Sequence, residues 1–190
     1  MKTSIQYISI ASIVYFLFLP IHTWTQSTTV HSDSLYSKIL KEQRPIKIIL
    51  PKKYNAGLTD RMDVFYVLDG EWNTSLAEKL YEFLEFAKFI PTNMIIVSVP
   101  NYYKNGINMR DRDFTPTVAE NSDGKSNPNS GGAHKFLLFL KDELIPFVNR
   151  KYPTNSENNI LYGTSSGGLF AIYAYLHDPA VFKLYLTVEP

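Results

Sequence analysis

The chain of 190 residues contains no cysteine. A thiol is required for a disulfide, a thiolate metal site and a cysteine nucleophile, so all three are excluded. A lipoprotein anchor, which is attached to a cysteine at the cleavage point of a signal peptide, is excluded for the same reason. The absence of cysteine neither favours nor opposes export.

The sequence also lacks an excess of either charge. It has 19 basic and 18 acidic residues, a formal net charge of +1, so it has none of the basic surplus of proteins that bind nucleic acid or anionic membranes. Hydrophobic residues make up 45% and charged residues 19%, which is ordinary for a globular protein. The length suits one domain with a sizeable core.

The apolar run near the N-terminus, ISIASIVYFLFL at residues 8–19, is too short to span a membrane, which takes about 20 residues. Lys2 precedes the run, and Pro20 and a polar stretch follow it, which is the layout of a secretory signal peptide. We predict a signal peptide over 1–26 and an exported domain over 27–190, periplasmic or secreted, with no membrane span in the mature chain. The alternative is a buried first strand or helix of the domain.

Apolar runs bounded by turn residues predict the strands of a sheet. MDVFYVL at 62–68 and MIIVSV at 94–99 are almost unbroken, as expected for strands buried on both faces. Residues 34–40 and 45–50 suit a first hairpin, and two later strands are expected over 158–162 and 182–188.

Helical patterns separate these strands. One helix is predicted behind a capping box at Ser75 and Glu78, one over 133–151 that Pro146 should kink, and one over 169–176. On the first helix, the side chains expected to face the core are Leu76, Leu80, Phe83, Leu84 and Ala87. Alternating strands and helices predict one α/β domain, a mostly parallel sheet with helices on both faces.

Residues 163–168 read GTSSGG and fit the pattern G-x-S-x-G. This pattern is typical of the sharp strand-to-helix turn that presents a nucleophilic serine in α/β-hydrolases. The predicted strand and helix on either side supply the required context. Gly163 and Gly167 suit positions where side chains would collide. The alternatives are an ordinary glycine-rich turn between a strand and a helix, or a phosphate-binding turn. The second lacks the G-x-G-x-x-G and P-loop spacings.

The chain resembles the esterase family of α/β-hydrolases that contains esterase D and the enterochelin esterases. GTSSGGLFAIYAYLHDPAVF at 163–182 is similar to the family's nucleophile block, and VFYVLDGEW at 64–72 to its strand ending in Leu-Asp-Gly. RDFTPT together with GGA-x-KF is most similar to the siderophore-esterase branch. Members usually have a histidine before the nucleophile and a bulky residue after it, where this chain has Thr164 and Ser166.

The resemblance implies the α/β-hydrolase fold and roles for three residues. Ser165 is the expected nucleophile, and the backbone N–H of Ser166 is expected to donate to the oxyanion of the tetrahedral intermediate. By resemblance, the second oxyanion donor is the N–H of Glu71, after the Asp69-Gly70 turn, which could otherwise be a plain strand end. No metal or cofactor is implied, and the expected partner is a small-molecule ester.

Three further residues are candidates for substrate binding. Arg110 and Arg112 lie in the long polar segment 101–132, a length of loop that is usually functional or mobile. In the family this loop borders the active site, so either arginine could hold a carboxylate or phenolate of the substrate. The alternative is a surface arginine paired with a neighbouring aspartate. Tyr102, followed by Tyr103, could line an aromatic pocket or face solvent.

A serine nucleophile needs a general base, and none of the four histidines fits this role. His22 lies in the predicted signal peptide and His31 precedes the domain. His134 begins the helix that comes before the nucleophile strand. His177 lies 12 residues after Ser165, which is roughly 18 Å along a helix.

In α/β-hydrolases the acid and then the histidine follow the serine. Glu189 is a poor acid, because the resemblance implies an acid after a further strand. We therefore predict that the sequence is truncated at its C-terminus, that 27–190 is the N-terminal two-thirds of the domain, and that the acid and histidine lie beyond residue 190. The chain alone is then expected to be a poor catalyst.

Three functions remain open at this point. The first is a serine esterase that forms an acyl-enzyme and acts on a siderophore lactone, an acyl ester or a feruloyl-type ester. The second is a binding protein that keeps the fold without the base. The third is an acyltransferase on the same scaffold.

Overall fold

The computed structural model describes residues 29–51, 54, 60–89, 93–120 and 123–190. The predicted signal peptide, residues 1–26, lies outside this part of the chain. Within it, no helix combines the length and the apolar character that a membrane crossing requires.

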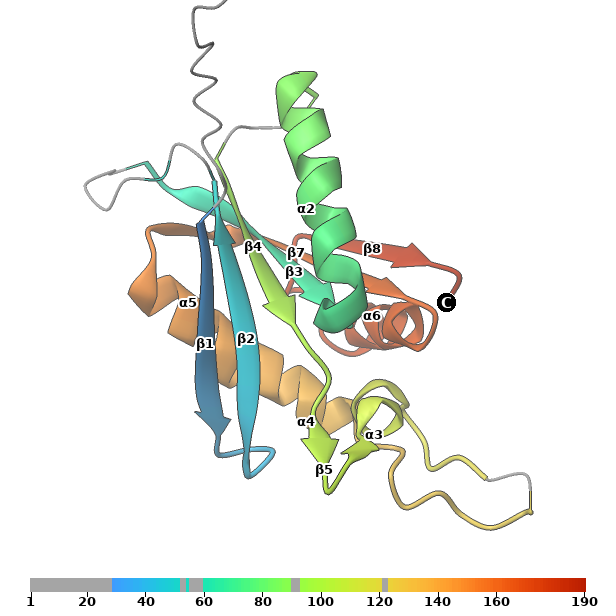
Figure 1. Cartoon of the computed structure of the whole chain (residues 1–190). Coiled ribbons are helices and arrows are strands. Elements are labelled where there is room, and N and C mark those ends of the chain that lie inside the picture. The colour runs from blue at the N-terminus through green and yellow to red at the C-terminus, as the bar shows by residue number, and fades with distance from the viewer. Residues whose placement is uncertain (1–28, 52–53, 55–59, 90–92, 121–122) are drawn as a thin grey trace, which may run out of the picture.

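Six strands form one sheet in the order β1-β2-β4-β3-β7-β8 (Figure 1). The pair β1–β2 is antiparallel, as is β2–β4, whereas β4, β3, β7 and β8 run parallel to one another. The predicted hairpin and mostly parallel sheet are therefore confirmed. The strand bounds are β1 Thr29–Ser37, β2 Glu42–Leu50, β3 Met62–Leu68, β4 Met94–Val99, β7 Thr154–Thr164 and β8 Leu184–Val188.

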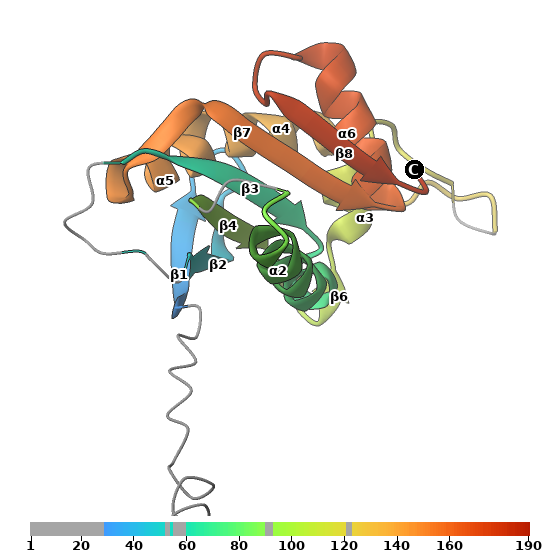
Figure 2. The same cartoon turned by 90° about the horizontal axis from the view of Figure 1, so that it is seen from above.

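One face of the sheet is covered by a long helical run and by α6 (Figure 2). The run continues through α4 (Ala133–Leu138), a π-helical segment η1 (Phe139–Leu144) and α5 (Ile145–Lys151). The wider π-helical turns come just before Pro146, which has no N–H to donate to the preceding turn. Phe136 lies at the centre of this face, its ring centroid 5.0 Å from that of Phe170 in α6 (Ser166–His177).

The helix α2 (Gly70–Phe86) lies on the opposite face, and two predictions for it are wrong (Figure 2). It begins directly after Asp69, whose φ of 52° makes the turn out of β3, so Ser75 is inside the helix and caps nothing. Its buried side chains are Ala77 and Tyr81, whereas Leu76 is 62% exposed. Also exposed, contrary to prediction, are Leu80 and Phe83.

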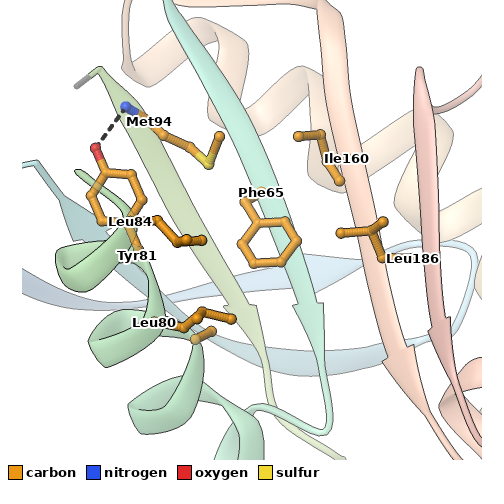
Figure 3. Close-up of a pocket in the computed structure, with 8 residues that line it drawn as sticks. Phe65, Leu80, Tyr81, Leu84, Met94, Ile160 and Leu186 are labelled. Carbon is orange, nitrogen blue, oxygen red and sulfur yellow. Dashed lines mark hydrogen bonds between the residues drawn. The ribbon is translucent and has the colours of Figure 1, made fainter. Parts of the chain in front are cut away.

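The exposed apolar side chains of α2, those of Leu76, Leu80 and Phe83, belong to a helix that leaves β7 and β8 uncovered on this face of the sheet. On β8, the side chains of Leu184, Leu186 and Val188 are all exposed. They lie on the same face of the sheet as the residues of β7 with which they pair. Between α2 and these strands lies an apolar pocket of about 180 Å³ (Figure 3). Its lining residues are Phe65, Ala77, Leu80, Tyr81, Leu84, Met94, Ile160 and Leu186.

The long segment after β4 contains short elements. The strands β5 (Tyr103–Lys104) and β6 (Ile107–Asn108) pair as a hairpin, and α3 (Arg110–Phe114) follows them. Phe114 is buried against the ring of Phe136, with 5.5 Å between centroids. This contact fixes α3 at the end of the sheet where β3, β4 and β7 reach their carboxyl ends (Figure 1).

Candidate active site

Ser165 occupies the junction between β7 and α6, with φ 52° and ψ −126°. A positive φ is uncommon for a residue other than glycine, and such strain is concentrated at functional turns. The backbone N–H of Ser165 donates to the carbonyl of Val188 at 2.9 Å, which fixes the turn against the end of β8. A Cβ on Gly163 would overlap the carbonyl oxygen of Gly167. The sharp turn expected from GTSSGG is therefore present, and Ser165 is exposed at its tip.

The two backbone amides proposed as oxyanion donors lie in the first turns of two helices. Ser166 is the first residue of α6 and Glu71 the second residue of α2. N–H groups of a first helical turn have no acceptor within the helix, so they are available to an anion. The strands before them, β3 and β7, are neighbours in the sheet. The carboxylate of Asp69, after β3, lies 3.1 Å from where a Cβ of Gly167 would be, so the two turns touch.

Arg110 extends from α3 to both turns. Its Nε and Nη2 donate to the two carboxylate oxygens of Asp69 at 2.7 and 2.9 Å. Its Nη1 donates to Ser166 Oγ at 3.0 Å, and Nη2 also donates to the carbonyl of Thr164 at 3.3 Å. The hydrogen bonds to Asp69 raise the pKa of Arg110 above its usual value. The arginine is paired, as in the alternative interpretation, but with a distant aspartate rather than a neighbour in sequence.

Arg112 points to the other side of α3, toward β2. It donates to both carboxylate oxygens of Glu42, at 2.8 and 2.6 Å, and its Nη2 lies 2.7 Å from Asp113 Oδ1. Burial alone would lower the pKa of Arg112, but these carboxylates raise it overall. Arg44 completes the group by donating to Asp113 Oδ2 at 2.7 Å. We call these four residues, Glu42, Arg44, Arg112 and Asp113, the ion cluster.

Tyr102 lies beside the ion cluster. Its half-buried ring lies 5.8 Å from the guanidinium carbon of Arg44 and 5.8 Å from that of Arg112. Tyr103, the next residue, is exposed and accepts a hydrogen bond from the side chain of Asn108 at 3.1 Å. The structure therefore groups Tyr102 with Arg112, and it brings Arg110 to Ser166, the residue after Ser165. Glu71 is linked to Arg110 less directly, through Asn101 and Asp69.

Two residues of the site did not stand out in the sequence as side chains. Asp69 is fully buried, and Asn101 donates to its Oδ1 at 2.8 Å. Asn101 also donates through its side chain and its backbone to the carboxylate of Glu71, at 2.8 and 3.0 Å. Their positions could be predicted from the sequence, because Asp69 directly follows the predicted strand 62–68 and Asn101 comes two residues after the predicted strand 94–99. Their mutual contact was not, since 32 residues separate them.

Ser165 Oγ makes no hydrogen bond within the described part of the chain. His177 is held elsewhere, with Nδ1 2.9 Å from the carbonyl of Tyr173 and its ring stacked on that tyrosine. His31 is on β1 and His134 on α4, while His22 lies outside the described residues. Among the residues that are described, no group of three acidic or histidine side chains could hold a metal ion. The apolar pocket of Figure 3 does not include Ser165 in its lining.

A family model described as "Putative esterase" matches residues 37–187. The chain belongs to this family. The match runs from the end of β1 into β8 and includes Ser165, Ser166, Glu71, Asp69 and Arg110. It confirms the resemblance drawn from the sequence blocks.

Two curated relatives are named as siderophore esterases. The ferri-bacillibactin esterase BesA of Bacillus subtilis is 35% identical over 86 residues, which are 43% of this chain and 30% of that protein. The siderophore enterobactin esterase of Emericella nidulans is 38% identical over 89 residues, 43% of this chain and 29% of that protein. The chain is therefore similar to proteins named as siderophore esterases, in agreement with the resemblance, and the match spans less than a third of their length.

Two solved structures share the fold. An IroE-like serine hydrolase from Shewanella oneidensis has a TM-score of 0.70 and 34% identity, over 83% of this chain and 49% of that one. The BES protein from Bacillus cereus also has a TM-score of 0.70, with 28% identity over 84% of this chain and 62% of that one. The predicted α/β-hydrolase type of fold is thus confirmed.

Proposed function

We propose that this chain is part of a serine esterase that cleaves a carboxylic ester through an acyl-enzyme. The observation that carries the proposal is Ser165, which is strained, exposed and placed at the sharp turn between β7 and the first turn of α6. Its Oγ would attack the ester carbonyl carbon and lose its proton to a base. The alcohol would then leave with that proton, and water would release the acid from Ser165 in the second half of the reaction.

The oxyanion would be stabilised by the backbone N–H groups of Ser166 and Glu71. Donors of this kind act in place, without reorganisation, and removal of one costs about 2.7–4 kcal/mol of transition-state stabilisation in other enzymes. Their position at two helix N-termini adds the favourable end of each helix dipole. Both donors are backbone groups, so their geometry depends on the side chains that fix the two turns.

We propose that the acid and the histidine follow residue 190 in a longer parent chain, and that residues 27–190 alone catalyse poorly. Two observations support this. The relatives are longer, since the matched region is 49% and 62% of the two solved structures. The apolar face formed by α2 and β8 is the kind of surface that further residues of a longer chain would cover (Figure 3).

The substrate class we propose is a siderophore ester or lactone, because the curated relatives carry names of that kind. We also propose that residues 1–26 direct export, so that the mature esterase acts in the periplasm or outside the cell. No cofactor is needed for this chemistry, because the carbonyl is activated by backbone donors alone.

The proposal is tested on the full-length product of the gene. It should hydrolyse p-nitrophenyl esters and a catecholate trilactone, and Ser165→Ala should abolish both activities. Ser156→Ala, which changes an exposed serine on β7, is the matched control and should retain them. Turnover that survives Ser165→Ala would contradict the assignment.

A second function, ligand binding without hydrolysis, is favoured by the lack of a hydrogen-bond partner for Ser165 Oγ among the described residues. In that case the full-length protein would bind the trilactone at unit stoichiometry and release no product. Addition of an alcohol acceptor separates a third possibility, since an acyltransferase would form a new ester instead of the free acid.

A further inference from the structure

We propose that Arg110 and Asp69 form a positioning pair that fixes the two oxyanion donors relative to Ser165. The inference rests on the proposed esterase function and deepens it. Neither side chain is a donor to the oxyanion in the mechanism above. Their role is to hold the turn after β3 and the turn after β7 at one fixed separation.

The turn after β3 depends on Asp69. Its carboxylate is completely buried, where an unpaired charge is strongly unfavourable. Both oxygens are satisfied, by the fork of Arg110 and by Asn101. Asp69 also accepts the backbone N–H groups of Trp72 and Asn73 on its carbonyl, at 2.9 and 3.0 Å. The position of Asp69 therefore sets the position of the first turn of α2, which includes Glu71.

The turn after β7 is held by the same guanidinium. Arg110 reaches the carbonyl of Thr164 and the hydroxyl of Ser166, the two residues on either side of Ser165. A guanidinium is planar and its N–H groups are fixed relative to one another. A single rigid group therefore holds the two turns at a fixed distance from each other. Lysine could pair with Asp69 but could not make this set of contacts.

Substrate binding by the same edge of Arg110 conflicts with this geometry. The Nε and Nη2 edge, which would grip a carboxylate with two hydrogen bonds, is already occupied by Asp69. A substrate anion at that edge would leave a buried carboxylate without its partner. The guanidinium carbon also lies 5.4 Å from the ring of Phe114 and 5.7 Å from that of Trp72, which further fixes its plane.

The pair also has an electrostatic effect. The oxyanion would develop next to the turn that contains Asp69, and a bare carboxylate there would oppose it. Arg110 compensates the charge of Asp69, so the helix N-termini act on the oxyanion without that opposition. Asn101 similarly pairs the carboxylate of Glu71 with two donors, its backbone N–H and its side-chain amide.

The first experiment measures kcat and KM of the full-length protein with two esters of similar size, neutral p-nitrophenyl butyrate and anionic p-nitrophenyl hemisuccinate. Arg110→Lys and Asp69→Asn should each lower kcat about 100-fold for both esters, as expected for donors displaced by a fraction of an ångström to 1 Å. KM should change little, and Arg150→Lys, an exposed arginine on α5, should leave both constants unchanged. A rise in KM confined to the anionic ester, with kcat retained, would overturn the proposal and assign Arg110 to substrate binding.

The second experiment does not depend on activity. Amide hydrogen exchange is followed at Trp72 and Ser165, whose N–H groups donate to Asp69 and Val188 in the two turns. Arg110→Gln should speed exchange at both amides about tenfold, whereas Arg150→Gln should not. Asp69→Asn combined with Arg110→Gln should recover part of the protection, because no charge is left unpaired.

The two experiments separate the two claims. An inactive wild-type protein would contradict the esterase proposal, while exchange would still decide whether the pair positions the turns. Unchanged exchange at both amides in Arg110→Gln would overturn the positioning role even in an active esterase. If Arg110→Gln does not fold, Arg110→Lys keeps the charge and loses the fork, so faster exchange in that variant supports the proposal and unchanged exchange overturns it.

Discussion

Arg110 and Arg112 lie two residues apart on the short helix α3, and each binds a buried carboxylate in a different part of the molecule. Arg110 reaches the carboxyl ends of β3 and β7, where Ser165 is. Arg112 reaches β2, on the antiparallel side of the sheet. Two similar side chains from one helix therefore differ in role because their hydrogen-bond partners differ: Asp69 and Thr164 for Arg110, and Glu42 for Arg112. One connects turns whose geometry the proposed reaction needs, and the other anchors the segment that contains both.

The anchor is a closed set of charges. In the ion cluster, the two arginines and the two carboxylates alternate, so each charge has partners of the opposite sign. Arg44 and Asp113 are each 1% exposed. Loss of one partner from such a set is costly because another charge stays buried without compensation. The comparison thus predicts large effects on stability from the cluster and effects on kcat from the positioning pair.

The largest effect on stability is expected for Asp113→Ala. It removes a carboxylate from between Arg44 and Arg112, so the free energy of unfolding should fall by about 3–5 kcal/mol. Urea unfolding followed by circular dichroism measures the change. Asp111→Ala, an exposed aspartate on the same helix, is the control. Equal losses of stability in the two variants would contradict the claim that the buried carboxylate of Asp113 contributes more to stability than an exposed one.

A smaller effect is expected for Arg112→Gln. Arg44 still pairs with Glu42 and Asp113 in this variant, so the loss should be roughly 1–3 kcal/mol, the cost of leaving part of a buried polar group unsatisfied. The same urea titration measures it. A variant of unchanged stability whose KM rises only for the anionic ester would instead place Arg112 at the substrate and remove the distinction from its neighbour.

The smallest effect concerns pH. Burial would raise the pKa of Glu42, but hydrogen bonds from Arg112 and Arg44 and their charges lower it overall. A carboxyl whose pKa is lower in the folded state stabilises the fold above its unfolded pKa of about 4.5, and this stabilisation is lost as pH falls through the folded value. In Glu42→Gln, the free energy of unfolding should therefore change less between about pH 5 and pH 3. Parallel profiles for the variant and the wild type would show that Glu42 is not held by the cluster.

The sheet was predictable because its signals are local. β3 and β4 have the predicted bounds, since a strand buried on both faces leaves a continuous apolar run whose ends are marked by polar and turn residues. The helix α2 was predicted less well. It has two apolar faces, and a pattern of apolar residues does not tell which one packs on the sheet. Ala77 and Tyr81 do so, while Leu76 and Leu80, which form the more obvious apolar stripe, are exposed.

The same distinction holds within the candidate site. The turn at Ser165 was predictable because Gly163 and Gly167, only four residues apart, come so close together that a side chain on Gly163 would collide with Gly167. The pair of Arg110 with Asp69 was not, because the two are 41 residues apart and meet only through the order of the strands. Sequence reasoning gave both arginines of α3 the same candidate role, and only the fold distinguishes their neighbours.

The central claim is that Ser165 is the nucleophile, and covalent labelling tests it most directly. The full-length product is treated with a fluorophosphonate, and the modified peptide is identified by mass spectrometry. We predict one adduct, on Ser165, that is absent in Ser165→Ala and present in Ser156→Ala. An adduct on another residue, in a protein that hydrolyses the ester substrates, would contradict the account.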